Sequence, residues 1–217
     1  CASSARVEAG LLRRNVERVM ASTTAKDAVL VYAAIAMASS EALGRFAGGR
    51  VPDVTDREAA AKIVEREITL RDAMAESSAW DIVARELVTG MQVSFEVGYP
   101  AIVNLLAKGF DMNVATVHAF LTILSRLPDT FIARKVGAAL EEDISKAVEL
   151  GLDKAREVSR RAARVLELGG LSTEEGRAAL WRFDEELRSQ GNELNPGTTA
   201  DLTASSLMVA ILCGARP

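Results

Sequence analysis

The sequence predicts an all-α protein, folded as a single multi-helix bundle or array over residues 1–217. Apolar residues recur at steps of three and four, as in Val114, Val117, Leu121 and Leu124, which is the period of an amphipathic helix. Aromatic residues make up only 5% of the chain, and Ala, Leu, Glu and Arg are abundant, which favours helices over strands. No segment alternates apolar and polar residues over the length of a strand. Typical helix lengths then predict roughly eight to ten helices.

The N-terminal half contains one clear helix start and one clear loop. Residues Thr24–Asp27 form a capping box with aspartate in place of the usual glutamate. We expect the helix that begins there to end near Gly44. The stretch 45–56 contains two adjacent glycines and a proline, so it is the best candidate for a long loop. A long helical region is expected over 57–90, with a bend at Ser77–Ser78.

The C-terminal half is divided by prolines, glycines and capping residues. Pro100 is well placed in the first turn of a helix, and Asn113 is the expected cap of the next helix, which Pro128 interrupts. Ser172–Glu175 is a second capping box. Asn195–Gly197 then breaks the chain before a final, almost wholly apolar helix. Because that helix has no polar face, we expect it to be buried at the centre of the fold.

Composition and charge exclude several classes of protein. The net charge is −4 and the pI about 5.3, which argues against a nucleic-acid-binding protein but is compatible with a local basic pocket for phosphates. The longest apolar stretches, Ala28–Ala38 and Leu202–Cys213, are shorter than the ~18 residues of a membrane span. Cys1 and Cys213 lie at opposite ends without C-x-x-C spacing, so the sequence contains no zinc or redox motif. Nothing in the sequence supports a disulfide between them, and the composition suits a reducing cytoplasm. Neither a P-loop nor a Rossmann glycine motif is present.

The first candidate site is the segment Asn195–Leu202, a loop that leads directly into the apolar final helix. Gly197 allows close backbone approach, and Thr198 and Thr199 offer hydroxyls and backbone donors at a helix start, where anions bind well. Asp201 could hold a metal ion or accept a proton. The alternative is structural, because Thr198 and Asp201 also have the spacing of a capping box.

The second candidate site is Pro128–Lys135. If Asp129 begins a helix, then Asp129, Thr130, Arg134 and Lys135 lie within two turns of one another, and the two cations could bind phosphate oxygens. The alternative is a capped surface helix with two solvated cations. His118 shares the apolar face of its own helix, so we expect a neutral, hydrogen-bonded core residue.

Three segments together resemble the triphosphoribosyl-dephospho-CoA synthase family. Asp184–Leu212 is similar to its C-terminal signature, in which an Asp-containing helix leads to Pro-Gly, small hydroxyl residues and Ala-Asp-Leu. Leu124–Gly137 resembles its Leu-Met-Ala…Asp-Thr-Asn…Arg-Gly-Gly region, and Trp80–Pro100 a helical segment of its archaeal-type branch. The resemblance implies that ATP gives its triphosphoribosyl group to the 2′-hydroxyl of 3′-dephospho-CoA with release of adenine. The product would be the precursor of a prosthetic group for an acyl carrier protein.

The resemblance also implies roles for the candidate residues. Asp201 and Asp129 would act as the catalytic base, and one of them would hold Mg²⁺. The triphosphate would be held by positively charged side chains and by the loop at the start of the final helix: Thr130, Arg134, Lys135, Asn195, Gly197, Thr198 and Thr199. The partners would be ATP and dephospho-CoA, and a homo-oligomer is compatible with the sequence.

The chain departs from the family pattern at several positions. Phe131 and Lys135 stand where the bacterial pattern has Asn and Gly, and Thr198-Thr199 replace a Gly-Ser pair, as in the archaeal-type branch. The family's N-terminal Lys-Pro-Gly segment is absent, so we expect these residues to be the C-terminal part of a longer family domain. Two alternatives stay open. One is another nucleotide- or phosphoribosyl-using transferase on the same fold, and the other is a non-catalytic helical domain with a degenerate site.

Overall fold

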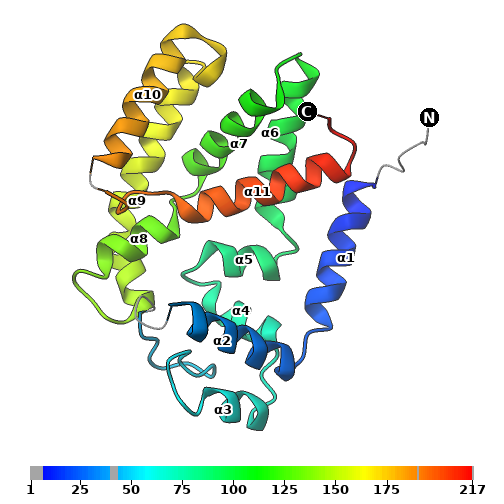
Figure 1. Ribbon diagram of the computed structural model, residues 1–217, viewed down its shortest axis with the longest axis vertical. Coiled ribbons are helices and arrows are strands. Elements are labelled where there is room, and N and C mark those ends of the chain that lie inside the picture. The colour runs from blue at the N-terminus through cyan, green and yellow to red at the C-terminus, as the bar shows by residue number, and fades with distance from the viewer. Residues whose placement is uncertain (1–6, 40–43, 190, 217) are drawn as a thin grey trace.

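The computed structural model describes residues 7–39, 44–189 and 191–216, and it confirms the all-α class. These residues form eleven α-helices, one π-helix and one 3-10 helix, without a β-strand among them (Figure 1). The β-type pairing in the described ranges is a single isolated bridge between Arg45 and Asp143.

The elements follow one another along the chain with short connections. They are α1 (Ala9–Ala21), α2 (Ala25–Ser39), α3 (Ala59–Glu65), α4 (Leu70–Ser77), α5 (Ile82–Val88), the π-helix η1 (Ser94–Gly98), α6 (Tyr99–Ala107), α7 (Met112–Arg126), α8 (Thr130–Gly137), α9 (Ile144–Glu167), the 3-10 helix η2 (Gly170–Ser172), α10 (Glu174–Arg188) and α11 (Gly197–Leu212).

The largest core cluster lies around the long helix α9, which packs against α7, α8 and α10. Its fully buried members include Leu121, Leu124 and Ile132. A smaller cluster around Ile63 and Ile68 holds α2, α3 and α4 together with the loop before α3, which contributes Val51. It lies at the end of the molecule away from α9 and α10 (Figure 1). Helix α11 runs across the front of the other helices and packs against η1, α5, α6, α7 and α8. The C-terminal helix therefore links α8 and α7 to η1, α5 and α6.

Helices α8 and α9 approach closely because glycines stand at their contact. A Cβ atom on Gly151 would lie 2.0 Å from the carbonyl oxygen of Ala133, and one on Gly137 would lie 1.8 Å from that of Ala147. No larger residue fits at either position without a shift of the backbone. This contact sets the position of α8 on the core.

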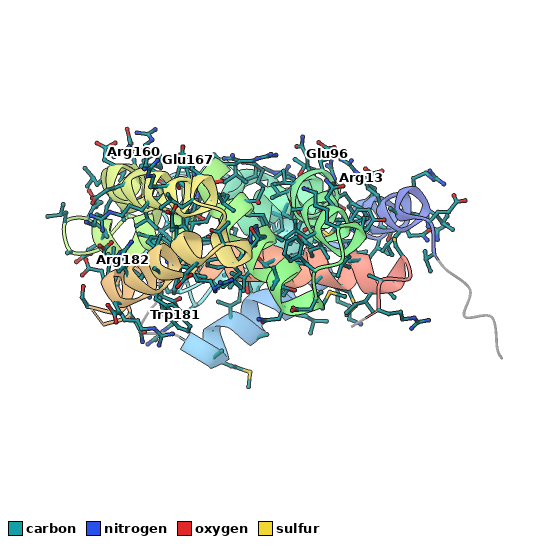
Figure 2. All side chains as sticks on the ribbon, turned by 90° about the horizontal axis from the view of Figure 1, so that it is seen from above. Arg13, Glu96, Arg160, Glu167, Trp181 and Arg182 are labelled. Atoms are coloured by element: carbon teal, nitrogen blue, oxygen red, sulfur yellow. The ribbon has the colours of Figure 1, made fainter. Side chains whose placement is uncertain are left out.

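Helix α1 is linked to the π-helix η1 by an ion pair. The guanidinium of Arg13 donates to a carboxylate oxygen of Glu96 in η1 at 2.7 Å, and Figure 2 shows the two residues together, away from Trp181 and Arg182 on α10.

Several predicted boundaries are confirmed. The Thr24 backbone N–H donates to Asp27 Oδ2 at 2.7 Å, and the Asp27 N–H donates to Thr24 Oγ1 at 3.4 Å, so the capping box is formed at the start of α2. Pro100 lies in the first turn of α6. No helix occurs over 45–56.

Other predicted boundaries were wrong. The region 57–90 is three helices, because Thr69 with Asp72 forms a capping box at α4 and Asp81 caps α5. Each cap gives the chain a new helix start, so one continuous helix does not form. Asp111, and not Asn113, caps α7 by accepting a hydrogen bond from Val114 N at 2.9 Å. Thr173, and not Ser172, caps α10.

The C-terminal helix is buried along one face and exposed along the other. Leu202, Thr203 and Ser206 are buried, whereas Met208 is 58% exposed. The short polar residues on the buried face bond to the helix itself, since Thr203 and Ser206 donate to the carbonyl oxygens four residues earlier.

No single helix in the described ranges has both the length and the hydropathy of a membrane span. The pair α1 and α2 would reach them only together, and it is bent by 93°.

Candidate active site

The starts of α8 and α11 are joined by one buried carboxylate. Asp129 is 1% exposed and caps α8, accepting hydrogen bonds at Oδ1 from Phe131 N at 2.9 Å and Ile132 N at 3.1 Å. Its Oδ2 accepts from the backbone N–H and the hydroxyl of Thr199, each at 2.7 Å. These bonds fix the two candidate segments of the sequence, about seventy residues apart, beside each other.

The hydrogen bonds of Asp129 also limit its chemistry. Two donors at each oxygen occupy the acceptor sites of a carboxylate. A proton or a metal ion could reach Asp129 only by displacing these donors. In this geometry the Asp129 carboxylate holds the starts of α8 and α11 together and has no free acceptor site for a proton or a metal ion. The same bonds occupy the Thr199 N–H and hydroxyl, so neither is free to bind an anion.

A polar pocket of about 240 Å³ opens beside this junction, and we call it the polar pocket. It is lined from α5, α8, α9 and α11 by Trp80, Asp81, Val83, Thr130, Phe131, Arg134, Val148, Thr198 and Asp201. It thus brings together four of the residues singled out from the sequence, Thr130, Arg134, Thr198 and Asp201. Within it, Thr130 Oγ1 accepts from Ile82 N at 3.3 Å, which connects α8 to the start of α5.

Sequence reasoning missed Asp81. The residue caps α5 by accepting from Ala84 N at 2.9 Å through Oδ1. The only local signal was an aspartate before an apolar helical segment, which is the ordinary pattern of an N-cap. Nothing in the local sequence places it next to Asp201.

The carboxylate of Asp201 is exposed, and it carries a perturbed pKa. Partial burial raises the pKa of Asp201, and the nearby negative charges of Asp129 and Asp81 raise it further. A carboxylate with a raised pKa is a stronger base, and a cation in the same pocket would relieve the repulsion.

Thr198 and Asp201 do not form the capping box that their spacing allowed. Helix α11 starts at Gly197 with Pro196 as its N-cap, and no side chain caps it. Thr198 is 8% exposed, and its hydroxyl has no hydrogen-bond partner in the described part of the chain. A buried hydroxyl without a partner costs free energy, so the pocket offers a bound ligand an unfilled hydrogen bond.

Arg134 is the cation of the polar pocket. Its guanidinium lies 4.9 Å from the centre of the Phe131 ring. Across residues 7–39, 44–189 and 191–216 it makes no hydrogen bond or ion pair, unlike the paired Arg161 of α9. A half-buried guanidinium without a carboxylate partner is suited to phosphate oxygens.

The other predicted phosphate ligands lie outside the polar pocket. Lys135 Nζ donates to the carbonyl oxygen of Asn192 and lies 4.1 Å from the centre of the Phe131 ring. Burial and, after it, the charge of Arg134 lower the pKa of Lys135. Asn195 lines a separate pocket of about 340 Å³ with Asp184. Neither side chain lines the polar pocket.

Gly197 has a packing role. A Cβ atom there would lie 2.8 Å from Cδ1 of Phe131, so the close approach is to an aromatic ring of the protein. His118 has the structural role expected of it, because its Nε2 accepts from Leu171 N at 3.1 Å. Burial and the charge of Lys108 lower the pKa of His118, which favours the neutral form.

The polar pocket has some of the ligands that Mg²⁺ prefers. The described residues contain no cluster of three acidic, histidine or cysteine side chains. Mg²⁺ is commonly held by one or two carboxylates together with substrate phosphates and water. Asp81 and Asp201 fit that pattern, with the Thr198 hydroxyl beside them.

The fold and the pocket define an all-α protein in which carboxylates near the starts of α5 and α11 share a pocket with a guanidinium that has no carboxylate partner among the described residues. The family model for ATP:dephospho-CoA triphosphoribosyl transferase matches residues 1–216, and the chain belongs to that family.

Individual relatives agree with this assignment. The chain is 32% identical over 124 residues to a candidate 2-(5′′-triphosphoribosyl)-3′-dephosphocoenzyme-A synthase of Pseudomonas fluorescens, which covers 57% of the chain and 37% of that protein. It is 26% identical over 167 residues to the corresponding protein of Pseudomonas syringae pv. tomato, an alignment that covers 73% of the chain and 51% of that protein. The chain thus spans about half the length, or less, of these curated relatives. A crystal structure of a candidate triphosphoribosyl-dephospho-CoA synthase from Archaeoglobus fulgidus superposes with a TM-score of 0.64 at 25% identity, covering 92% of this chain and 72% of that one.

Proposed function

We propose that the polar pocket transfers the triphosphoribosyl group of ATP to the 2′-hydroxyl of 3′-dephospho-CoA, with release of adenine. The observation that carries the proposal is the convergence of Asp81, Arg134, Thr198 and Asp201 on one pocket from three separate elements, the start of α5, α8 and α11. Family membership supports the choice of reaction.

The reaction exchanges one bond at the ribose of ATP for another. The 2′-hydroxyl oxygen of the acceptor forms a bond to C1′ of that ribose, and the bond from C1′ to the adenine nitrogen breaks. The bonding electrons leave with adenine. The hydroxyl proton passes to a carboxylate of the pocket, and adenine takes up a proton, so no further reactant is needed.

Asp201 is the base in this scheme. It lines the pocket, it makes no hydrogen bond within the described residues, and its raised pKa strengthens it as a proton acceptor. General base catalysis of this kind contributes roughly 10²- to 10⁴-fold to a rate. Asp129 keeps α8 and α11 in place, and it stays hydrogen-bonded throughout.

Arg134 and Thr198 would bind the triphosphate. Arg134 presents a planar guanidinium to phosphate oxygens, and the Thr198 hydroxyl supplies one more donor. Asp81 would hold Mg²⁺ together with the substrate phosphates, whose charge the ion neutralises when bound, and Asp201 stays free to take the proton. These assignments retain Arg134, Thr198 and Asp201 from the sequence prediction and add Asp81.

There is room for a second substrate next to the polar pocket. A larger pocket of about 470 Å³ shares Trp80, Thr130 and Val148 with it and extends toward Arg85. A transferase must bring two substrates to one reacting carbon. Adjoining pockets with a shared wall supply that arrangement, and the larger one would take the acceptor.

The test is release of adenine. The protein is incubated with ATP, Mg²⁺ and dephospho-CoA, and free adenine and the coupled product are followed by mass spectrometry. We expect both to appear together. Asp201→Asn should lower kcat/KM about 100-fold, and Arg134→Ala should raise the KM for ATP about tenfold or more. Arg182→Ala, at an exposed position of α10 (Figure 2), is the matched control and should change neither.

The outcomes separate the alternatives. Adenine release that requires a different hydroxyl acceptor would indicate another transferase on this fold. Unchanged kinetics in both Asp201→Asn and Arg134→Ala would show that the polar pocket is not the active site. No saturable heat on calorimetric titration with ATP and Mg²⁺ would indicate a non-catalytic helical domain.

A further inference from the structure

A second, more apolar pocket adjoins the polar pocket, and the proposed reaction does not yet use it. It has a volume of about 170 Å³ and lies where α2, α4 and the loop over 44–54 meet. Trp80, Asp81 and Arg134 line both pockets, so the two adjoin at these three residues. We call the second one the aromatic pocket.

Three aromatic side chains line the aromatic pocket. The rings of Phe46 and Trp80 have centres 6.0 Å apart and planes inclined at 38°. The Tyr32 hydroxyl donates to the carbonyl oxygen of Pro52 at 3.2 Å. Burial, followed by the charges of Glu76 and Asp53, raises the pKa of Tyr32 to about 12, so the ring stays neutral. In a chain with 5% aromatic residues, such a group is suited to a flat, apolar ligand.

Two buried polar atoms of this pocket's residues have no partner in the described chain. Glu76 accepts from Val51 N at 3.2 Å through Oε2, but its Oε1 is buried without a donor. Oε1 lies beside Gly49, only 1.4 Å from where a Cβ atom would stand, so the absence of a side chain at position 49 leaves room for the carboxylate. Trp80 Nε1 is a buried donor without an acceptor. Unpaired buried groups are costly, and a ligand with both a donor and an acceptor would satisfy them.

The charged residues of the two pockets indicate how the ligand is oriented. Glu76 and Asp53 lie on the aromatic pocket and Arg134 lies at its junction with the polar pocket. Asp53 is already occupied, since it accepts from the backbone and hydroxyl of Thr55 at 2.6 and 2.5 Å and from Phe46 N. The far end of the aromatic pocket therefore repels phosphate, while Arg134 attracts it.

We propose that the aromatic pocket binds the adenine base of the donor nucleotide, with the Glu76 carboxylate accepting a hydrogen bond from the 6-amino group. The inference rests on the proposed function for the identity of the donor, and on this pocket alone for the position of the base. The triphosphate then lies toward Arg134, and C1′ lies between the pockets beside Asp81. Adenine would depart on the opposite side of that carbon from the acceptor.

Calorimetric titration with ATP and with ITP, each with Mg²⁺, tests the proposal. ITP has a carbonyl oxygen where ATP has the amino group, so the Glu76 carboxylate should disfavour it about tenfold or more. In Glu76→Gln the side-chain amide can donate to that oxygen, and the preference should shrink at least tenfold or reverse. Glu65→Gln, at an exposed position of α3, is the control and should keep the native preference.

A second variant, Phe46→Leu, tests the proposal independently in case Glu76→Gln does not fold. Phe46→Leu should weaken ATP and ITP about equally and leave inorganic tripolyphosphate with Mg²⁺ unaffected, because only the base contacts Phe46. If ATP and tripolyphosphate bind but neither variant changes the affinities as described, the aromatic pocket is not the base site and the proposed function stands. If neither ATP nor tripolyphosphate binds, both proposals fail.

Discussion

Two carboxylates of the same junction have opposite environments. Asp129 is buried and accepts four hydrogen bonds, whereas Asp201 is exposed and makes none within the described residues. A saturated carboxylate stabilises the fold, and a free one beside other negative charges is available for a proton or a cation. Substitutions at the two positions should therefore have different effects.

Asp129→Ala should lower the free energy of unfolding by about 3 kcal/mol. The change removes hydrogen bonds to a charged acceptor and leaves buried donors of α8 and α11 unpaired. Urea unfolding measures the loss. Asp111→Ala, which removes only the exposed cap of α7, is the comparison and should cost about 1 kcal/mol. Equal losses in the two variants would contradict the junction role of Asp129.

Asp201 should make stability and activity respond to pH in opposite directions. Because its pKa is raised in the folded state, the folded protein binds the proton more tightly than the unfolded chain. Stability from this group is therefore full below the unfolded pKa, near 3.9, and is lost as pH rises through the raised folded pKa. Activity should rise over the same interval, since the base must be ionised.

The measurement is kcat/KM and urea stability across the acidic range, for the native protein and for Asp201→Asn. The substitution should remove this part of the pH dependence of stability while leaving the protein at least as stable near neutrality. A clear loss of stability near neutrality would instead mean that Asp201 has a structural role.

At the scale of the element, the close contact of α8 and α9 determines where the pocket residues of α8 lie. Arg134 and Thr130 are placed by a helix whose backbone touches that of its neighbour at Gly137 and Gly151. The orientation of Arg134, a proposed phosphate ligand, thus depends on two glycines that line none of the proposed substrate pockets.

Gly151→Ala should destabilise the protein by roughly 1–3 kcal/mol, because the added Cβ would meet the Ala133 carbonyl oxygen at 2.0 Å. Gly10→Ala in α1 is the matched change. There the nearest atom outside the helix backbone is the flexible end of Arg14 at 3.4 Å, so the better helix propensity should add up to about 1 kcal/mol. Thermal unfolding compares them, and a stable Gly151→Ala protein would show that α8 can shift without cost.

Helix starts were predictable where the signal is local. The Thr24–Asp27 box and Pro100 were identified because capping and proline geometry involve residues three or four apart. The region 57–90 was misread because its apolar residues fit one helical period, while Thr69 and Asp81 begin new helices within it. Asp81 was overlooked as a site residue because an aspartate before an apolar helix is the ordinary pattern of an N-cap.

At the scale of the whole molecule, the proposed donor site joins two parts of the fold with separate cores. The aromatic pocket belongs to the end built from α2, α4 and the loop, and the polar pocket to the end built from α8, α9 and α11. A ligand that spans both should stabilise the molecule as a unit.

ATP with Mg²⁺ should therefore raise the thermal midpoint, by an amount equivalent to about 2.7 kcal/mol at a free concentration one hundred times Kd. Tripolyphosphate with Mg²⁺ should give a smaller shift at the same concentration, because it contacts only the polar pocket. Scanning calorimetry measures both, and Arg134→Ala should reduce both shifts. A shift from tripolyphosphate as large as that from ATP would contradict a site that spans both pockets.

The sequence by itself determined the helical class, several helix starts, and the two segments that hold Arg134 and Asp201. Those properties depend on residue type and on spacings of three or four, which one sequence displays. Only the tertiary structure decided that Asp129 and Thr199 bond to each other, that Lys135 and Asn195 lie outside the polar pocket, and that Asp81 lines it. The physical reason is that contacts between distant segments depend on how closely helices pack, as at Gly137 and Gly151, and no local pattern records that distance.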